Sequence, residues 1–200
     1  MAGAEGAGPT GGWLVVGLGN PGPEYDQTRH NAGFAAVALL ARRHGAPLRR
    51  AGNGELARTR LGPDEVLLLR PLTYMNVSGE AVGPVARRHA IEPAHVLVVH
   101  DDMDLAAGRL RLRPGGGSGG HRGVASIVAK LGTDAVPRVR VGIGRPPAGQ
   151  DAVEFVLGAV GPDERPSWEA AITRAADAVE VVCRVGLEAA MARFNRSDPV

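Results

Sequence analysis

The sequence predicts an α/β fold: a single domain in which a mixed, twisted β-sheet is flanked by helices, with a long C-terminal helix. Three observations predict it. Apolar runs typical of strands alternate along the chain with segments whose apolar residues recur at helical spacing. Some strand segments are apolar throughout and others alternate apolar with charged residues, as expected of a mixed sheet. Glycine and proline, 29 and 15 residues of 200, separate these segments without forming a repeat.

The first half of the chain contains three predicted strands and two predicted helices. An apolar, β-branched run ends at the turn formers Gly19-Asn20-Pro21-Gly22, which indicates a buried strand followed by a tight loop. Phe34, Val37 and Leu40 recur at helical spacing, and Gly45 follows as a C-cap. Gly62-Pro63-Asp64 joins two strands as a hairpin. We expect strands over residues 13–18, 55–61 and 65–70, and helices over residues 31–44 and 76–90.

The second half repeats the alternation of strands and helices. Residues 96–100 are apolar up to His100, which predicts a strand covered on both faces. In residues 109–113 arginine alternates with leucine, which places three arginines on one face of a strand, and residues 138–141 repeat this pattern. A helix is expected over residues 122–131. The long C-terminal helix is expected to begin with Ser167 as its N-cap.

Composition excludes several classes of protein. No apolar run approaches the roughly 20 residues that a membrane-spanning helix needs, so no membrane partner is expected. Residues 1–12 lack both the basic start and the apolar segment of a signal peptide, and are predicted to be a disordered leader. The domain is expected over residues 13–195, with a tail at 196–200. The single cysteine, Cys183, excludes an internal disulfide and favours a cytoplasmic location.

Charge is concentrated in one part of the chain. The formal net charge is +2, but residues 108–146 hold eight basic residues against the single acid Asp134, a net charge of +7, which leaves −5 on the rest. Such an asymmetry predicts a local patch for phosphate or nucleic acid. The arginine pairs at 42–43 and 87–88 lie near the C-terminal ends of predicted helices. The helix dipole explains them without a ligand.

Two polar loops follow predicted strands and form the candidate site, because α/β sheets bind ligands beyond the carboxyl ends of their strands. The first loop carries Asn20, Tyr25 and His30, and the second begins with His100 and Asp101. A histidine oriented by a buried carboxylate is a suitable general base for activating water. His30 with Asp101 is therefore the candidate catalytic pair. The competing interpretation of His30 is a solvated or helix-capping residue.

Other chemistries are less favoured by the sequence. Asp101, Asp102 and Asp104 offer oxygen ligands, but they lack the glycine-containing pattern of a calcium loop, and no second acidic cluster accompanies them. The glycine-rich run at 115–123 could cradle a phosphate, yet no Lys-Ser or Lys-Thr follows it as in a P-loop. Asn20-Pro21 interrupts the turn that a dinucleotide site needs. A nucleophilic role for Cys183 is also disfavoured, because apolar residues surround it in the sequence.

Taken together, these segments resemble the bacterial-type peptidyl-tRNA hydrolase family from about Leu14 through the C-terminal helix. Many motifs in the same order and spacing make this resemblance highly specific. The matching stretches are Val16-Gly-Leu-Gly-Asn-Pro-Gly22, Tyr25, Thr28-Arg-His-Asn31, Gly33, Arg70-Pro71, Thr73-Tyr-Met-Asn76, Ser78-Gly79, His100-Asp101, Asp104-Leu105, residues 115–121 and Gly142-Ile-Gly-Arg-Pro146.

The resemblance implies an enzyme without a cofactor or metal that cleaves the ester between a peptide and the 3′ ribose of tRNA. By position, His30 resembles the catalytic base, Asp101 the carboxylate that holds it, and Asn20 the asparagine that distinguishes blocked from free aminoacyl groups. The other matched positions are implied to contact the tRNA end, the peptide or the 5′-phosphate: Tyr25, Tyr74, Met75, Asn76, Arg113, His121 and Arg140. We expect a monomer that binds the acceptor stem and 3′ end.

One residue departs from the family pattern. Gly-Gly-His-Asn-Gly is present here as Gly119-Gly120-His121-Arg122-Gly123, so a guanidinium replaces an amide expected near the scissile ester. An amide both donates and accepts hydrogen bonds, whereas a guanidinium only donates and is always charged. Arg122 could stabilise an oxyanion, lower the pKa of His30 or bind phosphate. The departure keeps two alternatives to the hydrolase open: a tRNA- or RNA-binding relative without activity, and an aminoacyl-tRNA-dependent transferase.

Overall fold

A computed structural model describes residues 12–196. Most of the predicted leader, residues 1–11, and most of the predicted tail, residues 197–200, lie outside this range. The described chain contains seven strands and six α-helices, with short 3-10 helices between them. The strands are β1 Trp13–Gly17, β2 Arg49–Ala51, β3 Gly54–Leu61, β4 Asp64–Pro71, β5 Val96–Asp102, β6 Leu110–Arg113 and β7 Arg138–Gly142. The α-helices are α1 Ala32–Arg43, α2 Gly79–Arg88, α3 Arg122–Leu131, α4 Ala152–Leu157, α5 Arg165–Val185 and α6 Leu187–Phe194.

All seven strands form one mixed sheet in the order β2-β3-β4-β1-β5-β7-β6. Strands β4, β1, β5 and β7 run parallel to their neighbours in this group, while β2, β3 and β6 pair antiparallel at the two sides. The four parallel strands therefore end at the same edge of the sheet. This architecture confirms the predicted α/β fold class.

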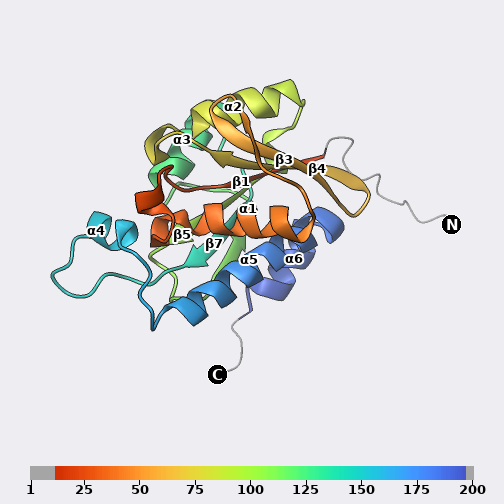
Figure 1. Ribbon diagram of the computed structural model, residues 1–200. Coiled ribbons are helices and arrows are strands. Elements are labelled where there is room, and N and C mark those ends of the chain that lie inside the picture. The colour runs from red at the N-terminus through yellow and green to blue at the C-terminus, as the bar shows by residue number, and fades with distance from the viewer. Residues whose placement is uncertain (1–11, 197–200) are drawn as a thin grey trace.

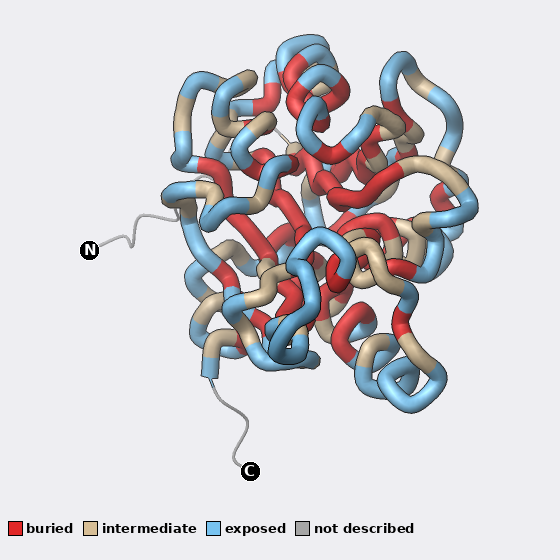
Figure 2. Tube along the Cα trace, turned by 90° about the vertical axis from the view of Figure 1, so that its left-hand side faces the viewer, coloured by how far each residue is buried: buried red, intermediate tan, exposed pale blue. Residues whose placement is uncertain are grey.

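Helices cover both faces of the sheet (Figure 1). Side chains of β1 alternate between the two faces: Val15 packs with α1, α5 and α6, whereas Leu14 and Val16 pack with α2 and α3. Both faces of the central strands are therefore buried, which explains their uninterrupted apolar sequences. Figure 2 shows these buried strands at the centre of the molecule with exposed loops around them.

The helix predictions were confirmed with three differences. The segment at 76–90 divides into the 3-10 helix η3 Met75–Val77 and α2. Helix α5 begins at Arg165 and not after Ser167, whose hydroxyl donates to the carbonyl oxygen of Glu164. Pro166 in the first turn explains the earlier start, because proline lacks only an N–H that has no partner there. At Gly186, with φ 108°, the helix is interrupted and α6 begins.

The predicted arginine alternation holds in β6 but is only partly right in β7. Leu110 and Leu112 are buried while Arg111 and Arg113 are exposed. Arg138 was expected to be an outward residue, but it is buried, because the glycine-rich loop covers it. Its guanidinium donates to the carbonyl oxygens of Gly116 and Gly117.

Two further findings concern expectations from composition. Cys183 is buried in α5, as predicted, and burial raises the pKa of its thiol. None of the helices within residues 12–196 is both long enough and apolar enough to cross a membrane.

Candidate active site

A cavity of about 540 Å³ opens where the parallel strands end. Its lining comes from the loop after β1, the 3-10 helices η2 Arg29–Asn31 and η3, the end of β5, the glycine-rich loop before α3, and α4. Segments far apart in the sequence meet here because their strands share one sheet edge. The lining residues include Asn20, His30, Tyr74, Met75, Asn76, Asp101, His121 and Arg122.

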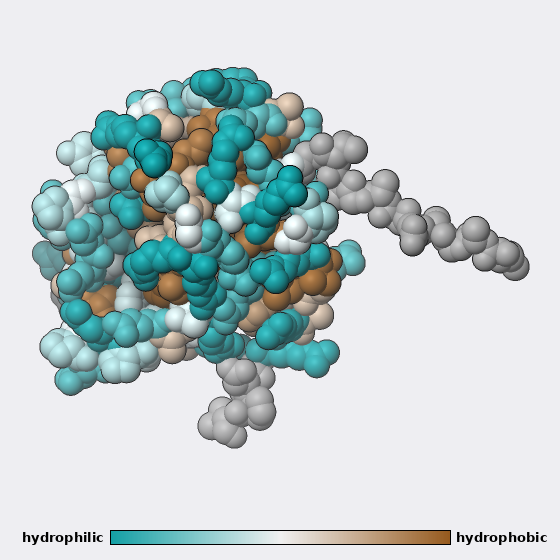
Figure 3. Space-filling view, turned by 45° about the vertical axis from the view of Figure 1, so that its right-hand side comes forward, coloured by the Kyte–Doolittle hydropathy of each residue, from teal (hydrophilic) through white to brown (hydrophobic). Residues whose placement is uncertain are grey.

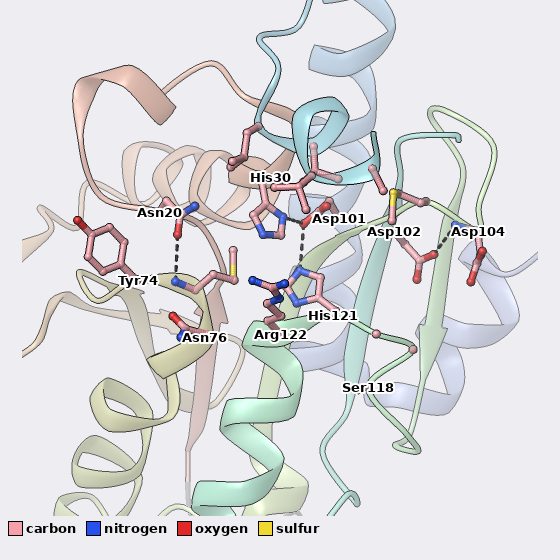
Figure 4. A pocket seen from close by; sticks show the side chains of 18 residues that line it. Asn20, His30, Tyr74, Asn76, Asp101, Asp102, Asp104, Ser118, His121 and Arg122 are labelled. Carbon is pink, nitrogen blue, oxygen red and sulfur yellow. Dashed lines mark hydrogen bonds and ion pairs between the residues drawn. The ribbon is translucent and has the colours of Figure 1, made fainter. Parts of the chain in front are cut away.

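His30 and Asp101 lie together, as the sequence predicted. The Nδ1 atom of His30 lies 2.9 Å from Oδ1 of Asp101, and Figure 4 shows the ring directed into the cavity. Asp101 is only 3% exposed. Burial alone would raise the pKa of Asp101, but hydrogen bonds from His121 and His30 hold that pKa well below its usual range. The ionised carboxylate therefore accepts the Nδ1 proton of His30, so that in the neutral ring Nε2 is the unprotonated nitrogen that a general base requires.

His121 shares the same carboxylate oxygen. Its Nε2 lies 3.1 Å from Oδ1 of Asp101, while its Nδ1 accepts the backbone N–H of Val124 at 3.3 Å and so caps α3. An Nδ1 that accepts carries no proton, so the proton of neutral His121 is on Nε2 and is donated to Asp101. His121 thus holds the carboxylate that holds His30.

A third histidine lies behind this pair. His100 is 3% exposed, and its Nδ1 lies 2.6 Å from the carbonyl oxygen of Asp101, to which it donates. Its ring meets that of His121 edge to face at 4.6 Å. Burial, which disfavours the charged imidazolium, lowers the pKa of His100 to about 3, so this ring stays neutral over the physiological pH range.

Asn20 is fixed from two sides. Its Oδ1 accepts the backbone N–H of Met75 at 3.0 Å. The side chain of Asn31 bonds both the N–H and the carbonyl oxygen of Asn20, at 2.8 and 3.0 Å. Because Oδ1 is engaged, the Asn20 side chain presents its Nδ2 donors to the cavity.

The predicted substrate-contacting residues of the loops after β1 and β4 differ in whether they line the cavity. Tyr74, 67% exposed, and Asn76 lie on the cavity wall, and Met75 is buried beneath them. Tyr25 ends the 3-10 helix η1 Pro23–Tyr25 and does not line the cavity, so its contact with a substrate stays a prediction. Of Asn20, Tyr25 and Asn76, two therefore line the same cavity.

A second cavity of about 240 Å³ contains the predicted phosphate-binding arginines. Arg113 and Arg140 line it together with the glycine-rich loop, His100 and Arg138. The Nε of Arg140 also donates to Asp102 at 2.5 Å, and Asp104 forms an ion pair with Arg145 at 2.6 Å. Two of the three clustered aspartates thus neutralise arginines.

Among residues 12–196, one group could offer three ligands to a metal ion: His30, Asp101 and His121, whose ligand atoms lie within 4.8 Å of one another. In the structure both histidines bond to the same oxygen of Asp101, so the three side chains form a histidine–carboxylate–histidine arrangement.

The comparisons with known proteins agree with this geometry. The family model described as peptidyl-tRNA hydrolase matches residues 14–199. The chain belongs to the peptidyl-tRNA hydrolase family. The peptidyl-tRNA hydrolase of Symbiobacterium thermophilum is 49% identical over 91% of this chain and 98% of its own length, and that of Mycobacterium tuberculosis is 47% identical over 91% and 96%. The crystal structure of peptidyl-tRNA hydrolase from Acinetobacter baumannii superposes with a TM-score of 0.88 at 38% identity, covering 98% of this chain and all of that one.

Membership of the peptidyl-tRNA hydrolase family confirms the resemblance inferred from the motifs. It does not by itself explain two residues to which the sequence patterns gave no role. Asn31 holds the Asn20 loop, and Arg29 connects the site to α4. The Arg29 guanidinium donates to the carbonyl oxygens of Phe155, Gly158 and Ala159, pairs with Glu164 and lies 4.6 Å above the Phe155 ring.

Helix α4 itself was not predicted, although it supplies the apolar wall of the cavity through Val153, Val156 and Leu157. The signal that could have revealed it is Asp151, whose carboxylate accepts the N–H groups of Val153 and Glu154 as an N-cap.

Proposed function

We propose that this chain hydrolyses the ester between a peptide, or an N-blocked aminoacyl group, and the 3′ ribose of tRNA. The observation that carries the proposal is the His30–Asp101 pair, 2.9 Å apart in the lining of an open cavity, in a chain of the peptidyl-tRNA hydrolase family. The product is a free tRNA that can be charged again.

In the first step His30 Nε2 takes a proton from a water molecule as the water oxygen attacks the ester carbonyl carbon. The carbonyl π electrons move to the carbonyl oxygen. Asp101 stabilises the imidazolium that forms and keeps the ring oriented, and His121 keeps Asp101 in place. Donors from Asn20 Nδ2 and Asn76 face the developing oxyanion.

In the second step the tetrahedral intermediate collapses. The bond between the carbonyl carbon and the ribose 3′ oxygen breaks, and the leaving oxygen takes the proton from His30. The peptide leaves with a new carboxyl group. No covalent enzyme intermediate is formed, and every proton transfer uses a residue of the cavity.

The tRNA is proposed to lie across both cavities. The ester and peptide occupy the larger one, and Arg113 and Arg140 bind phosphate of the acceptor stem at the smaller one. Peptide contacts are expected to be mostly to the main chain, because substrate peptides differ in sequence. We also propose a cytoplasmic monomer. On the face in Figure 3, charged and polar side chains separate the apolar patches, which favours a surface without a large permanent interface.

The decisive experiment uses N-acetyl-aminoacyl-tRNA, with and without an amine acceptor. Release without the acceptor supports a hydrolase, an acceptor-dependent product identifies a transferase, and binding without release identifies a tRNA-binding relative. His30→Ala should lower kcat by roughly 10²–10⁴-fold and leave tRNA binding intact, because a general base contributes about this much. His89→Ala, at the end of α2 and outside both cavities, is the matched control. Near-full activity of His30→Ala would contradict the assignment.

A further inference from the structure

Arg122 is a charged side chain of the larger cavity that the mechanism above does not use. It is the first residue of α3, is exposed, and lines the cavity beside His121. In Figure 4 its guanidinium lies next to the His121 ring, on the side that faces Asn20. No hydrogen bond or ion pair with another residue of the described chain engages it.

This position does not favour the folded state. The first turn of a helix carries a partial positive charge, so a cation there is repelled, and Arg122 has no acid to offset the repulsion. Other arginines around the two cavities differ: Arg140 pairs with Asp102, and Arg145 pairs with Asp104. Arg122 therefore brings an uncompensated positive charge to the place where the ester reacts.

The negative group that could pair with the Arg122 guanidinium is identified by elimination. Asp101 is occupied by His30 and His121, and Asp102 and Asp104 by their arginines. Arg122 does not line the second cavity, where Arg113 and Arg140 are placed for phosphate. The negative charge that develops in the larger cavity itself is on the carbonyl oxygen of the ester.

We propose that Arg122 is a catalytic residue that donates hydrogen bonds to the scissile carbonyl oxygen and holds the oxyanion formed when water attacks. The proposal rests on the hydrolysis proposed above. As the water oxygen bonds to carbon, the carbonyl π electrons move onto the oxygen opposite Arg122, and the water proton goes to His30. When the ribose oxygen leaves with that proton, the carbonyl re-forms. Arg122 stays protonated throughout, because a guanidinium is not deprotonated in proteins.

The test compares Arg122→Met, which keeps length but removes the donors and the charge, with Arg122→Lys, which keeps the charge and N–H donors but loses the planar guanidinium. Arg60→Met, on the exposed face of β3 and outside both cavities, is the matched control. Two substrates are used: N-acetyl-aminoacyl-tRNA and the corresponding aminoacyl ester of adenosine, which contains no phosphate. Arg122→Met should lower kcat by roughly 10²–10³-fold on both substrates, with a much smaller change in KM, because loss of one oxyanion donor has this effect. Arg122→Lys should retain an intermediate rate.

Two further measurements make the result specific. The dependence of tRNA affinity on salt should be the same for Arg122→Met as for the wild type, since removal of a phosphate-binding residue would lower its slope. The melting temperature of Arg122→Met should equal or exceed that of the wild type, because the repulsion at the helix N-terminus is removed.

A rate loss confined to the tRNA substrate, or a lower salt slope, would assign Arg122 to phosphate and overturn the proposal. An unchanged kcat, or a change in KM alone, would overturn it as well. These outcomes differ from failure of the proposed function, in which the wild-type chain itself releases nothing from N-acetyl-aminoacyl-tRNA and Arg122 loses its role with it.

Discussion

At the scale of single residues, the site depends on which nitrogen of each histidine carries a proton. His121 was expected to contact the substrate, yet both its ring nitrogens are used within the protein, one by Val124 and one by Asp101. A protonated His121 would lose its acceptor at Nδ1, so helix α3 would lose its cap. The tautomer of His121 that carries its proton on Nε2 therefore serves both contacts, because Nδ1 accepts from Val124 while Nε2 donates to Asp101.

His100 adds a pH dependence to stability. Its pKa is lowered to about 3 in the folded chain, against about 6.5 when unfolded, so between these values the unfolded chain binds more protons. Stability should therefore fall as the pH drops below about 6.5, by up to about 1.4 kcal/mol per pH unit for one group. Because the pKa of Asp101 is also lowered in the folded chain, stability should fall further as the pH drops below about 4.

We expect His100→Gln to flatten the decrease between pH 6.5 and pH 4, as measured by chemical denaturation at several pH values. His95→Gln, which removes a histidine at the other end of β5, is the control. Equal slopes for wild type and His100→Gln would show that His100 is not the acid-sensitive group.

At the scale of elements, the position of His30 depends on how closely α1 approaches the sheet. A Cβ on Gly33 would lie 2.2 Å from both the backbone nitrogen of Leu18 and the carbonyl oxygen of Val99. Gly17 faces the same contact, since its Cβ would lie 2.2 Å from the carbonyl oxygen of Gly33. Backbone meets backbone here, and the 3-10 helix that carries His30 directly precedes this contact.

Gly33→Ala should consequently lower the free energy of unfolding by about 3 kcal/mol, because an inserted methyl group has no side chain to displace. Activity should fall with it as His30 moves away from Asp101. Thermal unfolding and turnover of N-acetyl-aminoacyl-tRNA measure the two effects. For stability Gly117→Ala is the matched control, since nothing lies within 4 Å of its Cβ position. A fully stable Gly33→Ala chain would contradict the close contact.

The strands and helices predicted correctly are those whose own residues show a clear apolar pattern. Strands β1 and β5 are apolar because both faces are covered, and α1 and α3 show an apolar stripe. Strand β2 was missed because its exposed residues Arg49 and Arg50 carry no alternation and pair only through the register with β3. The burial of Arg138 was missed because it depends on a loop about 20 residues earlier.

In the candidate site, too, some residues could be predicted from the sequence and others depend on contacts between distant segments. His30 and Asp101 were predicted from their positions after parallel strands, since fold topology alone brings such loops together. The roles of Arg29 and Asn31 were not predicted, because each acts through backbone groups whose placement only the folded chain defines. The placement of Tyr25 outside the cavity likewise depends on the path of the loop after β1.

At the scale of the whole molecule, the basic surface lies on one side of the sheet edge. Register pairs Arg111 with Arg140 and Arg113 with Arg138, so these four side chains share one face of β6 and β7. Their leucine and valine neighbours pack on the opposite face with α5 and α6. The sheet thus presents its positive charge on the side that carries α3 and the glycine-rich loop.

Replacing both Arg113 and Arg140 by alanine should weaken tRNA binding and lower the slope of log affinity against log salt by about 1 for each phosphate that the variant no longer binds. Binding measured between about 50 and 200 mM salt gives this slope. A double variant of Arg49 and Arg50, at the opposite edge of the sheet, should keep the wild-type slope. An unchanged slope in the Arg113 and Arg140 variant would remove these residues from the interface.

The end of α6 determines how the outer edge of the sheet meets solvent. The side chain of Asn195 accepts the backbone N–H of Leu112 at 2.6 Å and donates to its carbonyl oxygen at 3.1 Å, as a neighbouring strand would. One amide thereby closes the exposed side of β6 against pairing with another chain. Removal of this last turn together with Asn195 would leave the backbone of β6 free to pair with a strand of another molecule. Aggregation would then follow from the loss of a residue that lines neither cavity.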